Sequence, residues 1–397
     1  MSYTNNAYVQ TKYFNYYAMV VIYALLLLPF MSLSGVQQIM GQSAYSAYQS
    51  AAMVLLFVLF LFKVRYIPKD AFSWLFLAFN ALVFYSTIQN YGFSMGILVN
   101  ILAYFFIVLL IQRDAELIIR ALAVIAVVAL IANFISLFRW GISDRVEYFV
   151  GGKNSMSIFL IPSAFLVMAD AYLRKGKSSW WVFCYAALVT LTVFLTRSAT
   201  GIVTAIAMCA GMLWIKKFKP NVVVVMIVMI LAQAVLVFLI DFLSALPIWA
   251  RILNWLGKEE TLTSRAFIWD QTIEIVKKNW LLGAGRGVVI RYTNSWGGRS
   301  TVSEAHNFFL ELLLEGGIVG VFLYVSLLLS AVKKLNMDSM QHRIFFICFV
   351  VILVNGLAEA ANNKIYVSIV LGLLSACSNN VVGNDRLRRR TEETASD

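Results

Sequence analysis

Residues 95 to 138 read MGILVNILAYFFIVLLIQRDAELIIRALAVIAVVALIANFISLF, and this stretch decides the fold class. It holds two apolar runs, 95–111 and 117–138, and a helix needs about 20 such residues to cross a bilayer. The apolar residues follow one another directly, without the alternation of apolar and polar residues that marks the strands of a membrane β-barrel. The stretch therefore predicts an all-α membrane protein.

The composition of the whole chain supports the same class. Of the 397 residues, 61% are hydrophobic and 13% are charged, whereas a soluble globular chain is roughly 25% charged. These values exclude an ordinary soluble enzyme, a disordered chain and a secreted disulfide scaffold. The hydrophobic residues suffice for roughly twelve helices of membrane-spanning length. With only five prolines in the chain, we expect most of these helices to run unbroken.

Twelve apolar segments are predicted to cross the membrane, so that residues 1–397 form a single integral membrane domain. The segments are 14–33, 48–62, 71–88, 95–111, 117–138, 155–172, 180–196, 198–214, 221–240, 307–330, 344–360 and 365–381. Lys and Arg are concentrated in alternate short connections, which is typical of cytoplasmic loops. We therefore expect cytoplasmic termini and a periplasmic loop, 241–305, between spans 9 and 10. This topology accounts for the net charge of +12, so no nucleic-acid partner is expected.

The loop 241–305 is the longest stretch outside the predicted spans. Within it, residues 246–256 (LPIWARILNWL) and 266–282 (AFIWDQTIEIVKKNWLL) show helical apolar spacing and carry tryptophans, which favour the membrane–water interface. We expect two amphipathic helices near the outer membrane surface. A purely structural cap has the same pattern, but the arginines of the loop and the histidine that follows them favour a functional role.

Arg197 interrupts the apolar run 191–207, LTVFLTRSATGIVTAIA. A charged side chain this close to hydrocarbon is costly unless it is paired or reaches water. One interpretation is an arginine that extends to the surface from a tight turn between two spans. The other is an anion site in an outward-facing cavity, because a guanidinium binds phosphate oxygens through two parallel hydrogen bonds. The residues themselves leave both interpretations open.

His306 lies where the long loop enters the tenth span, and it is the only histidine predicted on the outer side. Asn307 follows it, and Glu311 and Glu315 share one helical face a turn further on. A lone histidine at a membrane interface is more often structural than catalytic. The alternative is a general base beside an arginine-rich loop, with Asn307 and Glu311 orienting it or the acceptor, and the family resemblance described below favours that role.

Other kinds of chemistry have less support. The turn Gly283-Ala-Gly-Arg-Gly287 offers amides that can bind phosphate oxygens, but this signal is weak alone and a closely packed turn explains the glycines better. It neither follows a strand nor opens a helix, so it is no dinucleotide-binding fingerprint. The chain has no Walker A sequence and no Asp-x-Asp pair, and its four cysteines and two histidines are scattered. No metal site and no cofactor are therefore expected.

An ordered set of short motifs resembles the O-antigen polymerase and O-antigen ligase superfamily of bacterial envelope glycosyltransferases. The matching residues are Gly152-Lys-Asn154, Thr196-Arg-Ser198, Ser264-Arg-Ala-Phe-Ile-Trp269, Gly283-Ala-Gly285, Ala305-His-Asn-Phe-Phe-Leu310 and Glu315-Gly-Gly-Ile-Val-Gly320. The resemblance covers about residues 150–330, and the first six spans match only as a hydropathy pattern. It implies a GT-C-type fold that transfers a glycan from undecaprenyl pyrophosphate at the periplasmic face of the bacterial inner membrane, without metal or nucleotide.

The resemblance also implies roles for individual residues. The family's key groups are two arginines and a histidine, which correspond to Arg197, Arg265 and His306. We accordingly expect the two arginines to bind the donor pyrophosphate and the histidine to act as the base. The expected substrate-binding residues are Arg286, Arg291, Asn307, Glu311 and Asn154. Of these, Arg286 and Arg291 have no firm counterpart in the family.

The predicted activity is polymerisation of lipid-linked oligosaccharide repeat units. The stretch 264–269 looks more like polymerases, and the loop before His306 is short for gripping a bulky lipid A-core. The alternative is an O-antigen ligase, which transfers finished polymer to lipid A-core. A transporter of lipid-linked sugars needs no base and more often shows internal repeats, and we find none in the sequence. The expected partners are a lipid-linked donor and acceptor, membrane lipids and, as a candidate, a polysaccharide chain-length regulator.

Overall fold

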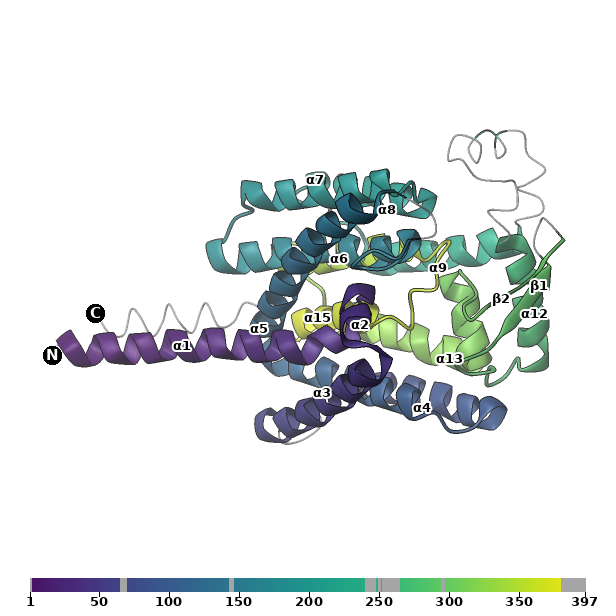
Figure 1. Cartoon of the computed structure of the whole chain (residues 1–397), viewed down its shortest axis with the longest axis horizontal. Coiled ribbons are helices and arrows are strands. Elements are labelled where there is room, and N and C mark those ends of the chain that lie inside the picture. The colour runs from purple at the N-terminus through teal and green to yellow at the C-terminus, as the bar shows by residue number, and fades with distance from the viewer. Residues whose placement is uncertain are drawn as a thin grey trace.

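The computed structural model describes residues 2–64, 70–142, 146–239, 248, 251, 265–293 and 297–379. These residues form a bundle of helices with one small hairpin (Figure 1). In chain order the helices are α1 (Ser2–Leu27), the 3₁₀ helix η1 (Leu28–Phe30), α2 (Ser34–Met40), α3 (Gln42–Lys63), α4 (Ala71–Tyr91), α5 (Met95–Trp140), α6 (Lys153–Lys175), α7 (Trp180–Leu195), α8 (Ala199–Trp214), α9 (Val222–Phe238), α12 (Arg265–Lys278), α13 (Phe308–Val332), α14 (Met340–Asn355) and α15 (Ile365–Ser378). Strands β1 (Ile290–Thr293) and β2 (Arg299–Val302) pair antiparallel.

Every predicted span overlaps a helix, but the helices differ in length from the spans. The runs 95–111 and 117–138 belong to a single helix, α5, which bends at Asp114. Within the described residues, α3, α4, α5, α6 and α13 are long and apolar enough to cross a membrane, and α1 with η1 and α2 adds a sixth candidate bent by 89°.

The other apolar helices are α7, α8, α9, α14 and α15, with 14 to 17 residues each. At 1.5 Å per residue they are roughly 21–26 Å long, which is shorter than a hydrocarbon core of ~30 Å. The prediction of a helical membrane protein is confirmed, and the number of twelve full spans stays a prediction.

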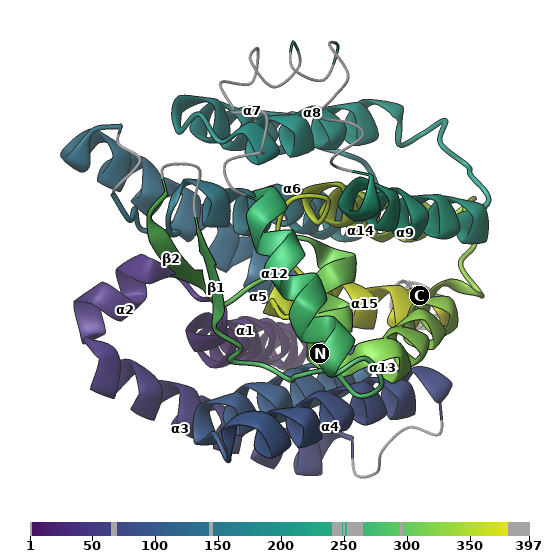
Figure 2. The same cartoon turned by 90° about the vertical axis from the view of Figure 1, so that its right-hand side faces the viewer.

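The helices form layers around α6. In Figure 2, α7 and α8 lie outside α6 on one side, while α3 and α4 lie on the far side of the bundle beyond α1 and α15. Of the membrane-span candidates α6 is the most buried, because α5, α7, α8 and α14 all pack against it. Large apolar side chains remain exposed on the outer helices, as a lipid environment allows. This core fixes the ends of the helices that carry the polar residues described below.

Helix α13 breaks at Gly317, where φ is 59°. The segment after α12 fills the break, because its backbone pairs with the peptide groups on both sides. The hydrogen bonds run from Ile318 N to Trp280 O (2.9 Å), from Val319 N to Leu281 O (3.2 Å), from Ala284 N to Leu314 O (2.7 Å) and from Gly285 N to Glu315 O (3.2 Å). A Cβ at Gly283 would lie 2.5 Å from the backbone of α13. The glycine-rich turn is therefore a packing device, and two of its amides are occupied by carbonyls of α13.

The two ends of the bundle differ in their polar residues. At the C-terminal end of α6, Asp170 pairs with Arg120 (2.7 Å) and Arg174 (2.8 Å). Helix α12 and the hairpin lie at the opposite end from the start of α1 (Figure 1). The predicted amphipathic helix at 266–282 corresponds to α12, and most of the one predicted at 246–256 lies outside the described residues.

Candidate functional site

Arg265 begins α12 and points into the connection between α14 and α15. Its Nε donates a hydrogen bond to the carbonyl oxygen of Ala358 (2.9 Å), and its Nη2 forms an ion pair with Oε1 of Glu359 (2.6 Å). Arg265 is 6% exposed and Glu359 is 3% exposed. Charges this deeply buried require close pairing and further hydrogen bonds to offset their desolvation. The pair therefore fixes the guanidinium in one orientation.

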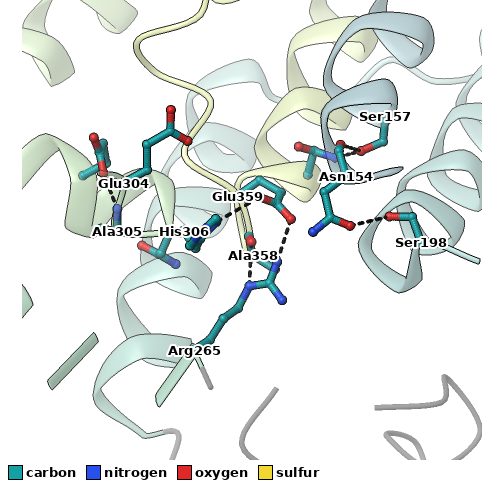
Figure 3. Close-up of polar contacts among 12 residues, drawn as sticks. Asn154, Ser157, Ser198, Arg265, Glu304, Ala305, His306, Ala358 and Glu359 are labelled. Carbon is teal, nitrogen blue, oxygen red and sulfur yellow. Dashed lines mark hydrogen bonds and ion pairs between the residues drawn. The ribbon is translucent and has the colours of Figure 1, made fainter. Parts of the chain in front are cut away.

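His306 uses the second oxygen of the same carboxylate. Its Nδ1 lies 3.1 Å from Oε2 of Glu359, and its side chain is 26% exposed (Figure 3). Burial raises the pKa of the Glu359 carboxyl, but the hydrogen bond with His306 and the charge of Arg265 lower it by more, so this pKa lies below its usual value. The ionised carboxylate only accepts hydrogen bonds, so in a neutral imidazole the proton lies on Nδ1 and the lone pair on Nε2. This is the arrangement of an oriented general base.

The backbone before His306 is clamped from two sides. The N–H of Ala305 donates to Oε2 of Glu311 (2.6 Å), and the carbonyl oxygen of Ala305 accepts from the indole Nε1 of Trp269 (2.9 Å). His306 itself has a φ of 53°, in the left-handed region that residues with a Cβ rarely adopt. The two hydrogen bonds thus hold a strained residue in place. Glu311, expected to bind substrate, lies buried in this clamp.

Asn307 caps the first turn of α13. Its Oδ1 accepts from the N–H of Leu310 (2.9 Å), and its Nδ2 donates to the carbonyl oxygen of Leu357 (3.2 Å). The side chain is fully buried. The amide oxygen therefore caps α13, the amide nitrogen ties this turn to the α14–α15 connection, and the contacts of Asn307 are structural.

A second polar pair faces this group from α6 and α8. Asn154 lies in the first turn of α6, and its Oδ1 accepts from Oγ of Ser198 (3.1 Å), the residue that caps α8. In Figure 3, Asn154 and Ser198 lie on the other side of Glu359 from His306. The N-termini of α6, α8 and α13 thus converge here, and such termini carry partial positive charge that favours anions.

Arg197 occupies the tip of the turn between α7 and α8, directly before Ser198. Its φ is 52°, and its N–H donates to the carbonyl oxygen of Phe194 (3.0 Å). The side chain is exposed, and no ion pair joins it to any residue of the described ranges. The structure places Arg197 in an exposed turn, and its role as an anion site stays a prediction. The turn is nevertheless next to the site, through Ser198.

The other two predicted arginines have different surroundings. The Nε of Arg286 pairs with Oε1 of Glu315 (2.8 Å), whose Oε2 accepts from Asn362 (3.2 Å). Arg286 is thus engaged inside the protein, where it ties the turn after α12 to α13. Arg291 is exposed on β1, opposite Thr301 in the register. The described contacts do not join either arginine to His306.

Sequence reasoning missed Glu359, which connects Arg265 to His306. The signal available was a single carboxylate in the apolar stretch 356–361 (GLAEAA) at the end of a predicted span, and an ionisable residue in a span is a candidate functional residue by default. As for metals, no three His, Cys, Asp or Glu side chains come together within the described ranges.

Comparison with known proteins adds independent information. Residues 184–325 match the family described as O-Antigen ligase. The exopolysaccharide production protein ExoQ of Rhizobium meliloti (strain 1021) is 24% identical over 230 residues, which cover 52% of this chain and 51% of that protein. The chain therefore spans about half the length of this curated relative. The matched range includes Arg197, Arg265 and His306. In the structure, Arg265 and His306 both contact the buried carboxylate of Glu359, and Ser198 of the turn that carries Arg197 lies on the other side of that carboxylate. Residues 184–325 are thus similar to the O-Antigen ligase family, and about half of the chain is similar to an exopolysaccharide production protein.

Proposed function

We propose that the chain polymerises oligosaccharide repeat units carried on undecaprenyl pyrophosphate, at the periplasmic face of the bacterial inner membrane. The observation that carries this proposal is the hydrogen-bonded chain from Arg265 through Glu359 to His306, which combines a fixed cation with an oriented base. A glycosyl transfer from a pyrophosphate donor needs both groups. It needs positive charge where the leaving pyrophosphate develops negative charge, and a base for the acceptor hydroxyl.

His306 is the proposed base. Its Nε2 takes the proton from a sugar hydroxyl of the acceptor as that oxygen bonds to the anomeric carbon of the donor. The bond from the anomeric carbon to the pyrophosphate oxygen breaks on the opposite face, so the configuration inverts. Glu359, only 3.1 Å from Nδ1, stabilises the imidazolium that forms, as the carboxylate does in a catalytic triad. No metal takes part in this scheme.

The leaving pyrophosphate requires positive charge that is not already neutralised. Because Arg265 pairs with Glu359, the two together carry no net charge. Arg197, exposed at the neighbouring turn, and the N-termini of α6, α8 and α13 supply the remaining positive potential. In this scheme Arg265 orients the carboxylate and contacts the donor, while Arg197 binds the pyrophosphate.

A polymerase also binds a second lipid-linked glycan. On the hairpin, Arg291 and Arg299 are both exposed, and the register places them diagonally on one face with Thr293 and Thr301. Ile290 and Tyr292 point to the other face and pack on the core. The outer face of the hairpin is therefore the proposed contact for the anionic headgroup of the acceptor. Arg286 is not proposed for this role, since Glu315 occupies its Nε.

The alternative activity is ligation of finished polymer to lipid A-core. The name of the Rhizobium relative refers to exopolysaccharide production, and this supports polymer assembly over ligation. The proposal includes a GT-C-type bundle with about twelve spans, cytoplasmic termini, a periplasmic site, membrane lipids as surroundings and a polysaccharide chain-length regulator as partner. The position of α12 and the hairpin at one end of the bundle supports this sidedness (Figure 1).

Deletion of the gene in its native host separates the two activities. Loss of a polymerase leaves surface glycolipid that carries a single repeat unit. Loss of a ligase leaves bare core while long polymer accumulates on undecaprenyl pyrophosphate, and this result would overturn the proposal. A plasmid copy with His306→Ala serves as the control, because it should accumulate in the membrane and yet fail to restore long chains.

A further inference from the structure

A small buried cavity lies where α6, α8, α14 and the start of α15 meet. Its volume is ≈ 10 Å³, about the room that one water molecule needs. Ser157 of α6, Thr204 of α8 and Asn355 of α14 place polar groups in its wall, and each of them is at most 3% exposed. No charged side chain is among the described residues that line it. The cavity is therefore polar, neutral and closed off by the core.

The hydrogen bonds around the cavity fix the orientation of the Asn355 amide. Its Nδ2 lies 3.0 Å from Oγ of Ser157 and 3.3 Å from Oγ1 of Thr204. Each hydroxyl has a single proton, and both protons are used, on the carbonyl oxygens of Asn154 (2.8 Å) and Thr200 (2.7 Å). The hydroxyls can therefore only accept from the amide, so its NH₂ group faces them and its oxygen Oδ1 does not.

Two acceptors at the cavity lack a donor. Oδ1 of Asn355 is buried and has no hydrogen-bond partner among the described residues. Pro162 lies inside α6 and has no N–H, so the carbonyl oxygen of Ile158 loses its usual helical donor. Both Ile158 and Pro162 line the cavity. A buried acceptor without a partner is costly, and the two protons of one water molecule satisfy both acceptors. A cation would bring a charge that no carboxylate in the wall balances.

The same hydrogen bonds lead to the candidate site. Asn355 is the last residue of α14, four residues before Glu359. Ser157, which accepts from Asn355, also bonds Asn154 beside the site (Figure 3). The residue after Asn355 is tied to the loop of His306, since its carbonyl oxygen accepts from the N–H of Phe308 (2.8 Å). The start of the α14–α15 connection is thus held from α6, α8 and α13 at once.

We propose that the cavity binds one water molecule, which donates to Oδ1 of Asn355 and to the carbonyl oxygen of Ile158, and that Asn355 so held positions Glu359. The water fixes the amide, the amide fixes the end of α14, and the end of α14 sets where the Glu359 carboxylate meets His306. The positioning role rests on the proposed function, whereas the water site does not.

Radiolytic footprinting tests the water site. Radiolysis converts a bound water into hydroxyl radicals, which oxidise the side chains beside it. Tyr366 lines the cavity and is 6% exposed, while Tyr185 is 5% exposed and does not line it. In the full-length protein in detergent, mass spectrometry should find Tyr366 oxidised at least tenfold faster than Tyr185. Asn355→Leu removes the oxygen and should lower the rate at Tyr366 to that at Tyr185. Pro162→Ala gives Ile158 a donor and should lower it in part.

A double-mutant cycle tests the positioning role. Asn355→Leu should lower kcat of polymerisation at least tenfold and leave KM nearly unchanged. If Asn355 acts through Glu359, the same substitution should cause little further loss in a Glu359→Gln background. Asn80→Leu is the matched control, because Asn80 is equally buried on α4 and donates to the carbonyl oxygen of Phe76 in its own helix (2.9 Å). Its effect should be the same in both backgrounds.

Each part of the inference has a result that would overturn it. Equal oxidation of Tyr366 and Tyr185 in the wild type, or an unchanged rate at Tyr366 in Asn355→Leu, would overturn the water site. Equal losses of kcat from Asn355→Leu with and without Glu359→Gln would overturn the positioning role. The footprint needs no turnover. A footprint in a protein that forms no polymer would contradict the proposed function alone, and polymer formation without a footprint would contradict only the water site.

Discussion

Trp269→Phe tests whether the clamp on Ala305 positions the base. The substitution keeps an aromatic ring in the core and removes the indole N–H that donates to the Ala305 carbonyl. Both residues are at most 1% exposed, so water does not replace the lost donor. A buried carbonyl left without a partner costs about 1–3 kcal/mol. The left-handed conformation of His306 costs a further ~1–2 kcal/mol, which is strain that the loosened loop can release.

We expect the cost of the unpaired Ala305 carbonyl and the strain at His306 to lower the fraction of molecules in which His306 is correctly placed. If the ~1–3 kcal/mol cost of the unpaired carbonyl appears in full as a free-energy difference that favours the relaxed loop over the active loop, the active fraction falls. Since about 1.4 kcal/mol corresponds to a factor of ten, kcat then falls roughly 5- to 150-fold. Donor binding should change little, because His306 does not bind the donor in the proposed mechanism. The loss should therefore appear in kcat and leave KM nearly unchanged.

The assay is steady-state polymerisation in proteoliposomes, with donor affinity and thermal unfolding measured in parallel. Trp280→Phe is the matched control, since the side chain of Trp280 is 62% exposed. Glu311→Gln retains an oxygen for the Ala305 N–H and should lose less activity than Glu311→Ala. An unchanged kcat in Trp269→Phe, or a loss confined to KM, would refute the positioning role. A loss of activity that merely follows the amount of folded protein would refute it as well.

Other predictions concern the buried charges and the packed turn. Glu359→Gln should lower kcat by ~10²-fold or more, because the imidazolium loses its counter-charge. The lowered pKa of Glu359 means that this residue stabilises the folded state at neutral pH and that the gain is lost as pH falls through its folded pKa. The free energies of unfolding of wild type and Glu359→Gln should therefore converge as the pH falls through this folded pKa, and a difference that persists in acid would contradict this. Arg265→Lys should lose most activity while the protein still accumulates, since one ammonium cannot bond both Ala358 and Glu359 in the same geometry. Gly283→Ala should prevent accumulation of folded protein, because its Cβ meets the backbone of α13 at 2.5 Å, and normal yield would argue against that packing. Polymerisation should continue in EDTA, and strict dependence on added magnesium would contradict the mechanism.

The helices could be predicted from the sequence because each apolar run is a local signal. The run 95–138 correctly predicted the residues of α5, but it predicted two helices where the structure has one bent helix. The reason is that the residues around Asp114 are polar and resemble a loop. The short lengths of α14 and α15 depend on where the chain turns back toward the site. That turning point is decided by contacts with residues far away in the sequence.

The site was predictable only in part, for the same reason. His306 and Arg265 were recognised from motifs, but their common partner Glu359 is 53 and 94 residues away from them. The role of Arg286 depends on Glu315, 29 residues later, and a loop arginine gives no local sign of such a partner. The glycines at 283 and 285 were compatible with a phosphate-binding turn, although a packed turn was favoured, and the backbone pairing at the break in α13 shows the packed turn.

The central claim is that this chain joins repeat units while they remain on their lipid carrier. The most direct measurement uses the purified protein in proteoliposomes with a single lipid-linked repeat unit as both donor and acceptor. The account predicts a ladder of lipid-linked products that differ by one repeat, one undecaprenyl pyrophosphate released for each bond formed, and no ladder with His306→Ala. A wild-type protein that leaves the repeat unit unchanged, and transfers glycan only when lipid A-core is added, would contradict it.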